Sequence, residues 1–335
     1  MITVHCRVED RVVSLVMPPS GVFPDGAVWV DLLNPTPEEQ AFIASSFHLV
    51  LPSVEEMREI ETSSRLYVED DAVFMTTSVI FQADTDRPDQ CDLTFILARR
   101  ALLTVRYAEP RSIPTFAARV HKQPELLASP EDALLGVLDA VIDRVADVLE
   151  MVGGRMDRLA RSVFFARLED KRPPARARRK RTEETADLQE VLREIGRAGD
   201  MTHKIRDTLS GMDRLSAFLV TAGAARFNKD HRTALKTLQR DVRSLTEHVG
   251  FLSQEANFLL DATLGLVNLE QNRIIKVFSV ASVAFLPPTL VGTVYGMNFH
   301  NMPELDWSFG YPWALFLMIL SGVLPLVYFR WRNWL

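Results

Sequence analysis

The chain has 335 residues, of which 47% are hydrophobic and 24% are charged, and its formal net charge at pH 7 is −6. This length allows a soluble domain together with a membrane domain, and the negative charge argues against a general nucleic-acid-binding protein. Cys6 and Cys91 lie far apart, which argues against a disulfide framework. We expect no signal peptide, because residues 1–10 mix charged and apolar side chains.

Residues 1–128 alternate short strand-like and helix-like segments and predict an α+β domain with a largely antiparallel sheet. The sequence Asn34–Pro35–Thr36–Pro37–Glu38–Glu39 predicts a helix start, with a capping residue, an early proline and carboxylates in the first turn. The domain carries no phosphate-binding glycine loop, no His-Glu-x-x-His and no Cys-x-x-Cys, so we assign no catalytic residue and expect no enzyme. Four segments have the composition of strands: 27–32, 72–81, 92–97 and 102–107.

From residue 129 onward the pattern is helical, and residues 129–222 predict a pair of long antiparallel helices. Apolar residues recur at three- and four-residue spacing from Leu134 to Val152 in the first helix, and the second runs from Thr182 to Val220. A basic run, Lys171–Arg181, lies between them. A solvated turn is the favoured interpretation of this run, and contact with anionic lipid headgroups is the alternative, so its role stays open.

A last long helix is predicted to begin at residue 229, and residues 229–273 are expected to form a cytoplasmic stalk. One face of this stalk is apolar at heptad spacing, including Leu238, Val242 and Leu252, and we expect it to pack against the preceding helix. Residues 274–295 are apolar and long enough, as a helix, to cross a bilayer. The stalk is therefore predicted to continue into a first membrane span.

A second span is predicted at residues 313–330, and a short link at 296–312 joins the two spans. The link contains no Lys or Arg, whereas basic residues precede the first span and follow the second, in the tail 331–335. The positive-inside rule then places both termini in the cytoplasm and the link outside. The sequence therefore predicts an integral membrane protein with two spans, in contact with membrane lipid.

A polar seam follows one face of the last helix across the predicted membrane boundary. Lipid disfavours such a stripe, whereas close helix packing or a water-filled path accommodates it. Packing does not require amides and a carboxylate beyond the membrane, so the longer seam favours a pore lining. Because one helix cannot enclose a channel, a pore requires a homo-oligomer with cyclic symmetry. The seam consists of Asp261, Gly265, Asn268, Asn272, Ile275, Ser279, Ser282, Leu286, Thr289 and Thr293, with Gln254 before them.

The link carries a motif that resembles a known family. Tyr295-Gly296-Met297-Asn298, followed by Met302-Pro303-Glu304-Leu305, is similar to the signature of the CorA family of magnesium transport proteins, closest to its enterobacterial type. The resemblance is dense over residues 255–335. It implies a funnel-shaped homopentamer in the bacterial inner membrane, with the first spans lining a pore for Mg²⁺ and also for Co²⁺ and Ni²⁺. Mg²⁺ is then the substrate and a regulator that closes the pore from inside, and no catalytic cofactor is implied.

The resemblance also implies roles for individual residues. Gly296, Met297 and Asn298 would form the selectivity filter, in which Gly296 and Asn298 supply oxygen atoms to the hydrated ion. The outer mouth would hold Tyr295, Glu304 and Asp306, whose two carboxylates raise the local cation concentration. The hydrophobic gate would comprise Ile275, Phe278 and Leu286, although the helical phase places Ser279 closer to the axis than Phe278. Asn272 and Asp261 would form inner polar rings, and the regulatory carboxylates are not identified.

Two other functions compete with this one. A zinc transporter of the same superfamily (ZntB-like) is the closer alternative, but the Met of the signature and the Met-Pro-Glu-Leu context are both intact. The seam also lacks the Cys and His ligands that Zn²⁺ favours. His300, just past the signature, is interpreted as a loop residue, and tuning of the affinity for Co²⁺ or Ni²⁺ is the alternative. A membrane-anchored coiled-coil scaffold would explain the helices and spans, but it would explain neither the seam nor the signature.

Overall fold

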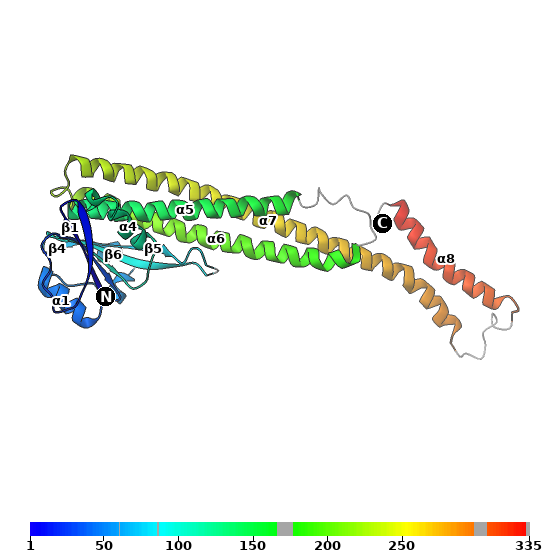
Figure 1. Cartoon of the computed structure of the whole chain (residues 1–335). Helices are drawn as coiled ribbons and strands as arrows, with labels where there is room; N and C mark the ends of the chain where they lie inside the picture. The colour runs from blue at the N-terminus through cyan, green and yellow to red at the C-terminus, as the bar shows by residue number, and fades with distance from the viewer. Residues whose placement is uncertain (60, 86, 166–176, 298–306, 333–335) are drawn as a thin grey trace. The chain divides into compact units, whose positions relative to one another are not determined.

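The computed structural model describes residues 1–59, 61–85, 87–165, 177–297 and 307–332 (Figure 1). These residues fall into two compact units, which are described separately. The first unit comprises residues 1–174 and 189–260, and the second comprises residues 175–188 and 261–335. The domain boundaries expected from the sequence stay predictions.

A seven-stranded sheet forms the centre of the first unit, with the strand order β2-β1-β3-β7-β6-β5-β4. Within the described residues only β3 and β7 pair in parallel, and the other neighbouring strands are antiparallel. The largely antiparallel sheet predicted from the sequence is therefore confirmed. The strands are β1 (Ile2–Val8), β2 (Arg11–Met17), β3 (Ala27–Leu33), β4 (Leu66–Glu69), β5 (Ala72–Phe81), β6 (Asp89–Leu97) and β7 (Leu102–Arg106).

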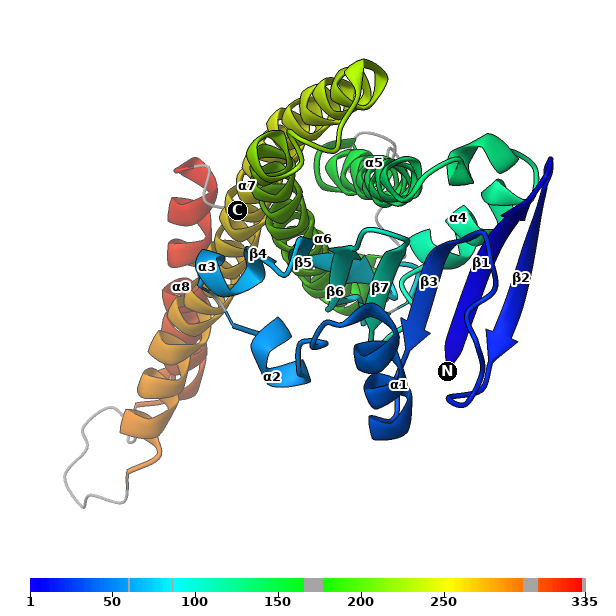
Figure 2. The ribbon, with the colours of Figure 1, turned by 90° about the vertical axis from the view of Figure 1, so that its left-hand side faces the viewer.

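Helices cover both faces of this sheet (Figure 2). On one face, Ile43 of α1 (Pro37–Phe47) is buried in a core with Val30, Leu32 and Ile96 of the strands. On the other face lie α4 (Ser112–Val120), the short η1 (Pro124–Leu127) and α5 (Pro130–Phe165). The short helices α2 (Val54–Met57) and α3 (Thr62–Arg65) precede β4. The unit is thus a three-layer arrangement with the sheet in the middle.

The start of α1 follows the predicted capping chemistry. The Glu39 backbone N–H donates to Thr36 Oγ1 at 3.2 Å, and the Thr36 N–H donates to Glu39 Oε2 at 2.9 Å. Pro37 occupies the first turn, where its missing N–H costs nothing. The same Glu39 oxygen accepts a 2.8 Å contact from the terminal ammonium of Met1, so this cap also holds the start of β1.

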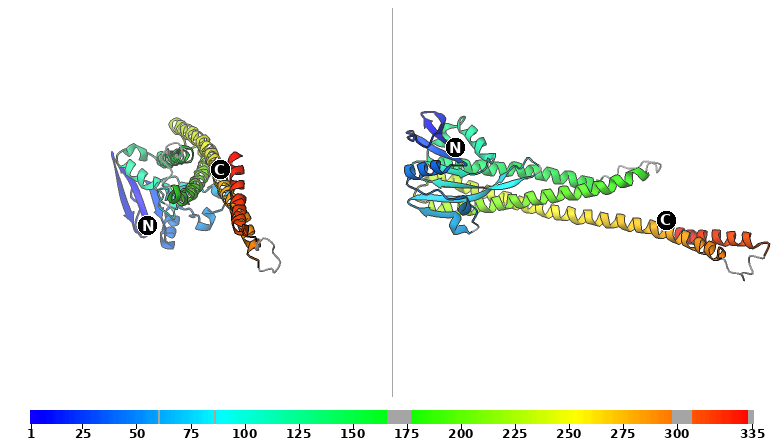
Figure 3. Two further views of the ribbon diagram at one scale, coloured as in Figure 1. Left: turned by 90° about the vertical axis from the view of Figure 1, so that its right-hand side faces the viewer. Right: turned by 90° about the horizontal axis from the view of Figure 1, so that it is seen from below.

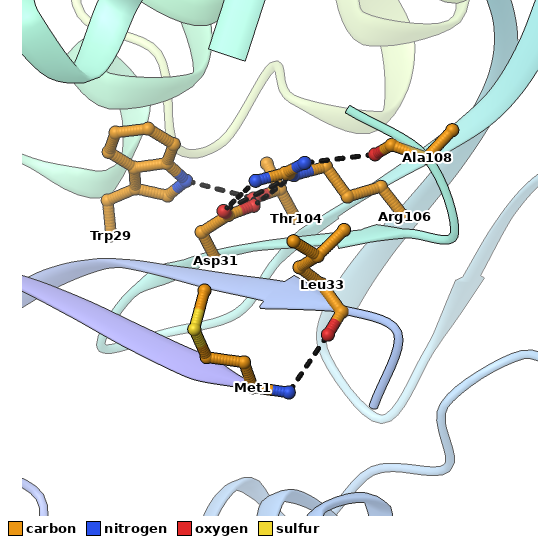
Figure 4. A network of polar contacts seen from close by, with 7 residues as sticks. All are labelled: Met1, Trp29, Asp31, Leu33, Thr104, Arg106 and Ala108. Carbon is orange, nitrogen blue, oxygen red and sulfur yellow. Dashed lines mark hydrogen bonds and ion pairs between the residues drawn. The ribbon is translucent and has the colours of Figure 1, made fainter. Parts of the chain in front are cut away.

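A buried polar network joins β3 to β7 across the parallel pair (Figure 4). The Arg106 guanidinium donates to both Asp31 oxygens, at 2.8 Å from Nη2 and 3.1 Å from Nε, and to the Ala108 carbonyl at 2.9 Å. Thr104 donates to Asp31 at 2.7 Å, and the Trp29 indole donates to Thr104 at 3.1 Å. Both charged side chains are more than nine-tenths buried. Because both side chains are almost entirely removed from water, each charge is stabilised by the other.

A neighbouring histidine is held neutral by the same layer. His5 stacks on Trp29 with ring centroids 4.1 Å apart, and its Nδ1 lies 2.7 Å from Ser14 Oγ. Burial lowers the pKa of His5 to about 4, against the opposing influence of Asp31. Ser14 Oγ also lies 3.0 Å from Nε2 of His121, so one hydroxyl links β2 to the end of α4.

Three long helices run side by side from the sheet in the first unit (Figures 1 and 3). They are α5, the part of α6 (Ala177–Ala222) after residue 188, and the part of α7 (Lys229–Tyr295) before residue 261. The apolar face expected on α7 is buried at Val242, Val249 and Leu252. α5 also packs against α7, because a Cβ at Gly153 would lie in van der Waals contact with Leu252, 3.8 Å from its Cδ2, and Phe164 stacks on Phe258 with ring centroids 5.8 Å apart. The sequence had predicted α6 alone as the partner of this face.

The start of α7 is fixed to the sheet by a cluster that the sequence did not reveal. Arg226, just before α7, donates to the carbonyls of Leu97 and Ala98 at 2.9 and 2.7 Å, and to Glu131 of α5 at 2.8 Å. In the first turn of α7, His231 Nε2 lies 3.1 Å from Asp132 Oδ1. These contacts hold α7 at the turn between β6 and β7 and at the first turn of α5.

Replacing the buried carboxylate should destabilise the first unit strongly. Asp31→Ala leaves the buried Arg106 guanidinium without its counter-charge, so we expect the free energy of unfolding to fall by about 3–5 kcal/mol. Denaturant unfolding of the detergent-solubilised chain, followed by circular dichroism, measures the change. Glu190→Ala is the control, because Glu190 pairs with Arg193 on the surface and should cost at most about 1 kcal/mol. Equal losses in the two variants would contradict the role of the buried pair.

Candidate functional site

Two helices of the second unit are long and apolar enough to cross a membrane: α7, which ends at Tyr295, and α8 (Gly310–Trp331). The spans expected at 274–295 and 313–330 lie within them. α8 is apolar around most of its circumference, with exposed side chains such as Ile319, Leu324 and Val327. Such a surface suits lipid, and it is not that of a helix exposed to water.

The two membrane helices lie side by side (Figure 3), and small residues and a proline lie at their contact. A Cβ added to Gly322 of α8 would lie 3.1 Å from Pro288 Cγ and 3.3 Å from the Ala284 carbonyl oxygen of α7. A Cβ added to Gly292 would lie 2.9 Å from the methyl group of Met318. Glycine at position 322 therefore permits a closer approach of the helices than a larger residue would, because Pro288 and the Ala284 backbone cannot move aside as the Met318 methyl group can.

α7 continues through Pro287 and Pro288, which lie inside the helix. Because a proline has no N–H, these two residues remove the usual hydrogen bonds to the carbonyls of Val283 and Ala284. The close approach of Gly322 lies at one of these carbonyls. Transmembrane helices tolerate such breaks where a neighbouring helix covers the freed backbone.

The side of α7 that faces α8 is less exposed to solvent than the rest of the helix. Its residues recur at three- and four-residue spacing, and Val280 among them is only 6% exposed. This α8-facing side consists of Val280, Ala281, Ala284, Pro287, Pro288, Val291, Gly292 and Tyr295.

The seam predicted from the sequence lies on the opposite side of α7. At about 100° per residue, the seam residues from Ile275 to Thr293 centre about 180° away from Ala284. Ile275 and Leu286 are 61% and 66% exposed in the single chain, and Phe278, at the edge of the seam, is 68% exposed. The polar members are exposed as well: Asp261, Asn268, Asn272, Ser279, Ser282, Thr289 and Thr293.

The threonines of the seam direct their protons to their own helix. Thr289 Oγ1 donates to the Leu286 carbonyl at 2.8 Å, and Thr293 Oγ1 donates to the Thr289 carbonyl at 2.7 Å. Each hydroxyl oxygen keeps lone pairs that can accept hydrogen bonds from water. This face therefore offers neutral oxygen atoms that can accept hydrogen bonds from the water shell of a hydrated cation.

The signature begins where α7 ends. The Gly296 N–H donates to the Gly292 carbonyl at 3.0 Å, and the Met297 N–H donates to the Val294 carbonyl at 3.3 Å. Met297 is 42% exposed. Asn298, Glu304 and Asp306 lie outside the described residues, and their roles stay predictions.

The comparison with protein families decides the assignment. Residues 24–331 match the family described as CorA-like Mg²⁺ transporter protein. The chain belongs to this family. It is 34% identical over 309 residues to the magnesium transport protein CorA of Escherichia coli K12, covering 92% of each chain. The CorA family is one of transport proteins, and this chain is an integral protein of the inner membrane, in agreement with its two spans.

Solved structures confirm the fold. The complete CorA magnesium transporter of Methanocaldococcus jannaschii matches with a TM-score of 0.74 at 17% identity, covering 100% of this chain and 99% of that one. The ZntB cytoplasmic domain of Vibrio parahaemolyticus matches with a TM-score of 0.57 at 12% identity, covering 79% of this chain and 97% of that one. The predicted sheet-and-helix domain, long helices and two C-terminal spans are thus confirmed.

Enlarging Gly322 should separate the membrane helices. Gly322→Leu places a side chain against Pro288 and the Ala284 carbonyl, and we expect an overpacking cost of about 1–3 kcal/mol. The melting temperature of the detergent-solubilised protein should fall by several degrees. Gly250→Ala is the control, since its Cβ meets nothing within 4 Å and alanine favours the helix. An unchanged melting temperature for Gly322→Leu would contradict the packing account.

Proposed function

We propose that this protein is a homo-oligomeric channel that carries Mg²⁺ across the inner membrane, with Co²⁺ and Ni²⁺ as further substrates. The observation that carries the proposal is the exposed seam of α7, which lies opposite the side that contacts α8. Membership of the CorA-like family supports Mg²⁺ as the ion.

A closed ring of identical chains gives this seam its function. α8 occupies one side of α7, so the seam is free to face a shared axis while α8 faces lipid. Cyclic symmetry then turns each seam residue into a ring, and the family resemblance implies five copies. Basic residues at the inner ends of both spans place both termini in the cytoplasm.

Selection of the ion is assigned to the outer end of the seam. Mg²⁺ loses its water shell reluctantly, so a filter that reads the hydrated ion is easier to build than a dehydrating cage. A ring of Asn298 amide oxygens with Gly296 carbonyls would accept hydrogen bonds from that shell without trapping the ion. Glu304 and Asp306 would gather cations at the mouth.

The gate is assigned to the large apolar members of the seam. Rings of Ile275 and Leu286 side chains, both more than half exposed in the single chain, would exclude water from a narrow pore. Phe278 lies at the edge of the seam and would contribute less directly. The rings of Asn272 and Asp261 then supply a polar inner path.

Intracellular Mg²⁺ is proposed to favour the closed state, as a ligand that binds one of two conformations more tightly. Among the described residues no group of three or more His, Cys, Asp or Glu side chains converges on one point. The residues of such a regulatory site are therefore left unnamed.

A zinc transporter is the second candidate, supported by the fold shared with the ZntB cytoplasmic domain. The described part of the seam places no His or Cys on its exposed face. Borderline Zn²⁺ favours those ligands, whereas Mg²⁺ favours oxygen, so the seam fits Mg²⁺ better.

Uptake in a magnesium-auxotrophic bacterium tests the proposal. We expect the wild-type chain to restore growth at low Mg²⁺, and Asn298→Ala to reduce uptake by about tenfold or more, because the filter loses its amide oxygens. Immunoblots of the membrane fraction must show equal amounts of both proteins.

The possible failures are distinguishable. If the wild type does not restore growth, the magnesium assignment is wrong. If Asn298→Ala transports normally, the filter assignment is wrong while the magnesium assignment stands. Accumulation of Zn²⁺ without rescue by Mg²⁺ would favour the zinc transporter.

A further inference from the structure

Two rows of opposite charge lie on two neighbouring helices of the first unit. One row is on α5 and the other is on α7, and steps of three or four residues keep each row on one side of its helix. The side chain of Asp139 is 41% exposed, and the other five residues are exposed. We define the acidic row as Asp139, Asp143 and Asp147, and the basic row as Lys236, Arg240 and Arg243.

α5 and α7 run in the same direction from the sheet, so the heights of the two rows can be compared. Asp132, in the first turn of α5, lies 3.1 Å from His231 in the first turn of α7, and a Cβ at Gly153 would lie 3.8 Å from Leu252. Both contacts join residues 99 positions apart. At 1.5 Å per residue, each member of the basic row is then within about 5 Å in height of one member of the acidic row.

The carboxylates of the acidic row repel one another. Arg119 of α4 lies 2.9 Å from Asp139 and 3.5 Å from Asp143. Burial raises the pKa of Asp143, and the carboxylates of Asp139, Asp147 and Asp241 raise it further, against the opposing influence of Arg119. A further cation beside the row would relieve this repulsion.

The described residues of the same chain form no ion pair with the basic row. Within that part of the chain, the ion pairs of the acidic row are those with Arg119, and none joins the two rows. The last described turn of α5 lies far from the basic row, because Phe164 stacks on Phe258, roughly 22 Å along α7 beyond Arg243. The basic row therefore presents its charges outward.

The basic row lies on the side of α7 that the seam continues. Arg240 precedes Gln254 and Asp261 of the seam by 14 and 21 residues, so the three lie within about 60° of one another around the helix. In a ring whose axis faces the seam, this side is turned toward the other copies.

A ring of identical chains requires contacts between unlike faces. Neighbours around a cyclic axis meet through two different surfaces, one from each copy, and every residue keeps its height along the axis. Two rows of opposite charge at similar heights on different helices satisfy both conditions. Complementary charge across such a contact also fixes its register and disfavours wrong pairings.

We propose that the acidic row of one copy binds the basic row of the next copy around the ring. This inference rests on the proposed function, because it requires a ring, but it is independent of which ion the ring carries. The contact joins the first units of neighbouring copies outside the membrane. Similar height pairs each acidic residue with one basic residue: Asp139 with Lys236, Asp143 with Arg240, and Asp147 with Arg243.

A zero-length cross-linker tests the contact directly. A carbodiimide couples a carboxylate to the amine of Lys236 only where the two groups touch, and coupling between copies gives covalent dimers of the full-length, detergent-solubilised protein on a denaturing gel. We expect such dimers, and mass spectrometry should find Lys236 joined to Asp139 or Asp143. Lys236→Gln should lose this product. Lys204→Gln is the control and should keep it, because Lys204 pairs within its own helix.

Charge reversal tests whether the two rows act on each other. Because an exposed ion pair changes an association constant by about two- to fivefold, reversing two members of one row should raise the concentration at which the oligomer dissociates on the order of tenfold. The variants are Arg240→Glu/Arg243→Glu and Asp143→Arg/Asp147→Arg, and mass photometry of the diluted protein measures dissociation. The four substitutions combined in one chain should restore the behaviour of the wild type.

A matched control separates the rows from net charge. Glu190→Arg/Asp200→Arg reverses two exposed carboxylates of α6 and should dissociate as the wild type does. Equal weakening in this control would show a general charge effect and would overturn the contact.

The remaining contradictory results differ in what they overturn. A monomeric wild type would overturn the proposed ring itself. An oligomeric wild type without the Lys236 product, or single-row variants that dissociate as the wild type does, would overturn the contact alone. Weakened single-row variants that the combined chain does not restore would show that the rows bind something else, such as a divalent cation or an anion, and would also overturn the contact.

Discussion

The contact between α7 and α8 at Pro288 and Gly322 determines which side of α7 is left uncovered by α8. Within a membrane, a backbone carbonyl that has lost its hydrogen bond must be covered by a neighbouring helix. α7 has two such carbonyls because Pro287 and Pro288 lack N–H groups. Gly322 lets α8 approach the Ala284 carbonyl closely. With α8 held on that side, the row of amides, hydroxyls and apolar side chains from Asp261 to Thr293 lies on the opposite side. The proposed selectivity, gating and assembly into a ring all depend on this division of one helix into two sides.

The first unit fixes the start of α7. Arg226 and His231 hold its first turn to the sheet and to α5, and the parallel pair of β3 and β7 beneath is joined by the buried Asp31–Arg106 pair. A buried pair of this kind adds little net stability but makes the loss of either partner costly. The pair joins β3 to β7, and β7 follows the turn after β6 on which Arg226 is anchored.

Local signals allowed much of this structure to be predicted from the sequence. Thr36, Pro37 and Glu39 specify a helix start by chemistry confined to one turn. The strand at 72–81 is mostly apolar on both faces, and it is largely buried on both. The edge strands β2 and β4, and β1 beside β2, gave no such signal. In β2, for example, Val13, Leu15 and Val16 are exposed and break the alternation. Asp31, Arg106 and Arg226 were missed for another reason: their partners lie 75 to 129 positions away along the chain. The seam was visible because its spacing is a property of one helix, whereas the side of α7 that α8 covers required the tertiary contact.

Cysteine accessibility along α7 tests the division of this helix most directly. Single cysteines replace Ser279, Ser282 and Thr289 on the seam, and Ala281, Ala284 and Val291 on the α8-facing side. A charged methanethiosulfonate reagent is then applied to cells while Mg²⁺ uptake is measured. We expect the seam variants to lose uptake, Mg²⁺ to slow this loss, and the other three variants to be unaffected. Block of the α8-facing variants with the seam variants unaffected would contradict this division of α7.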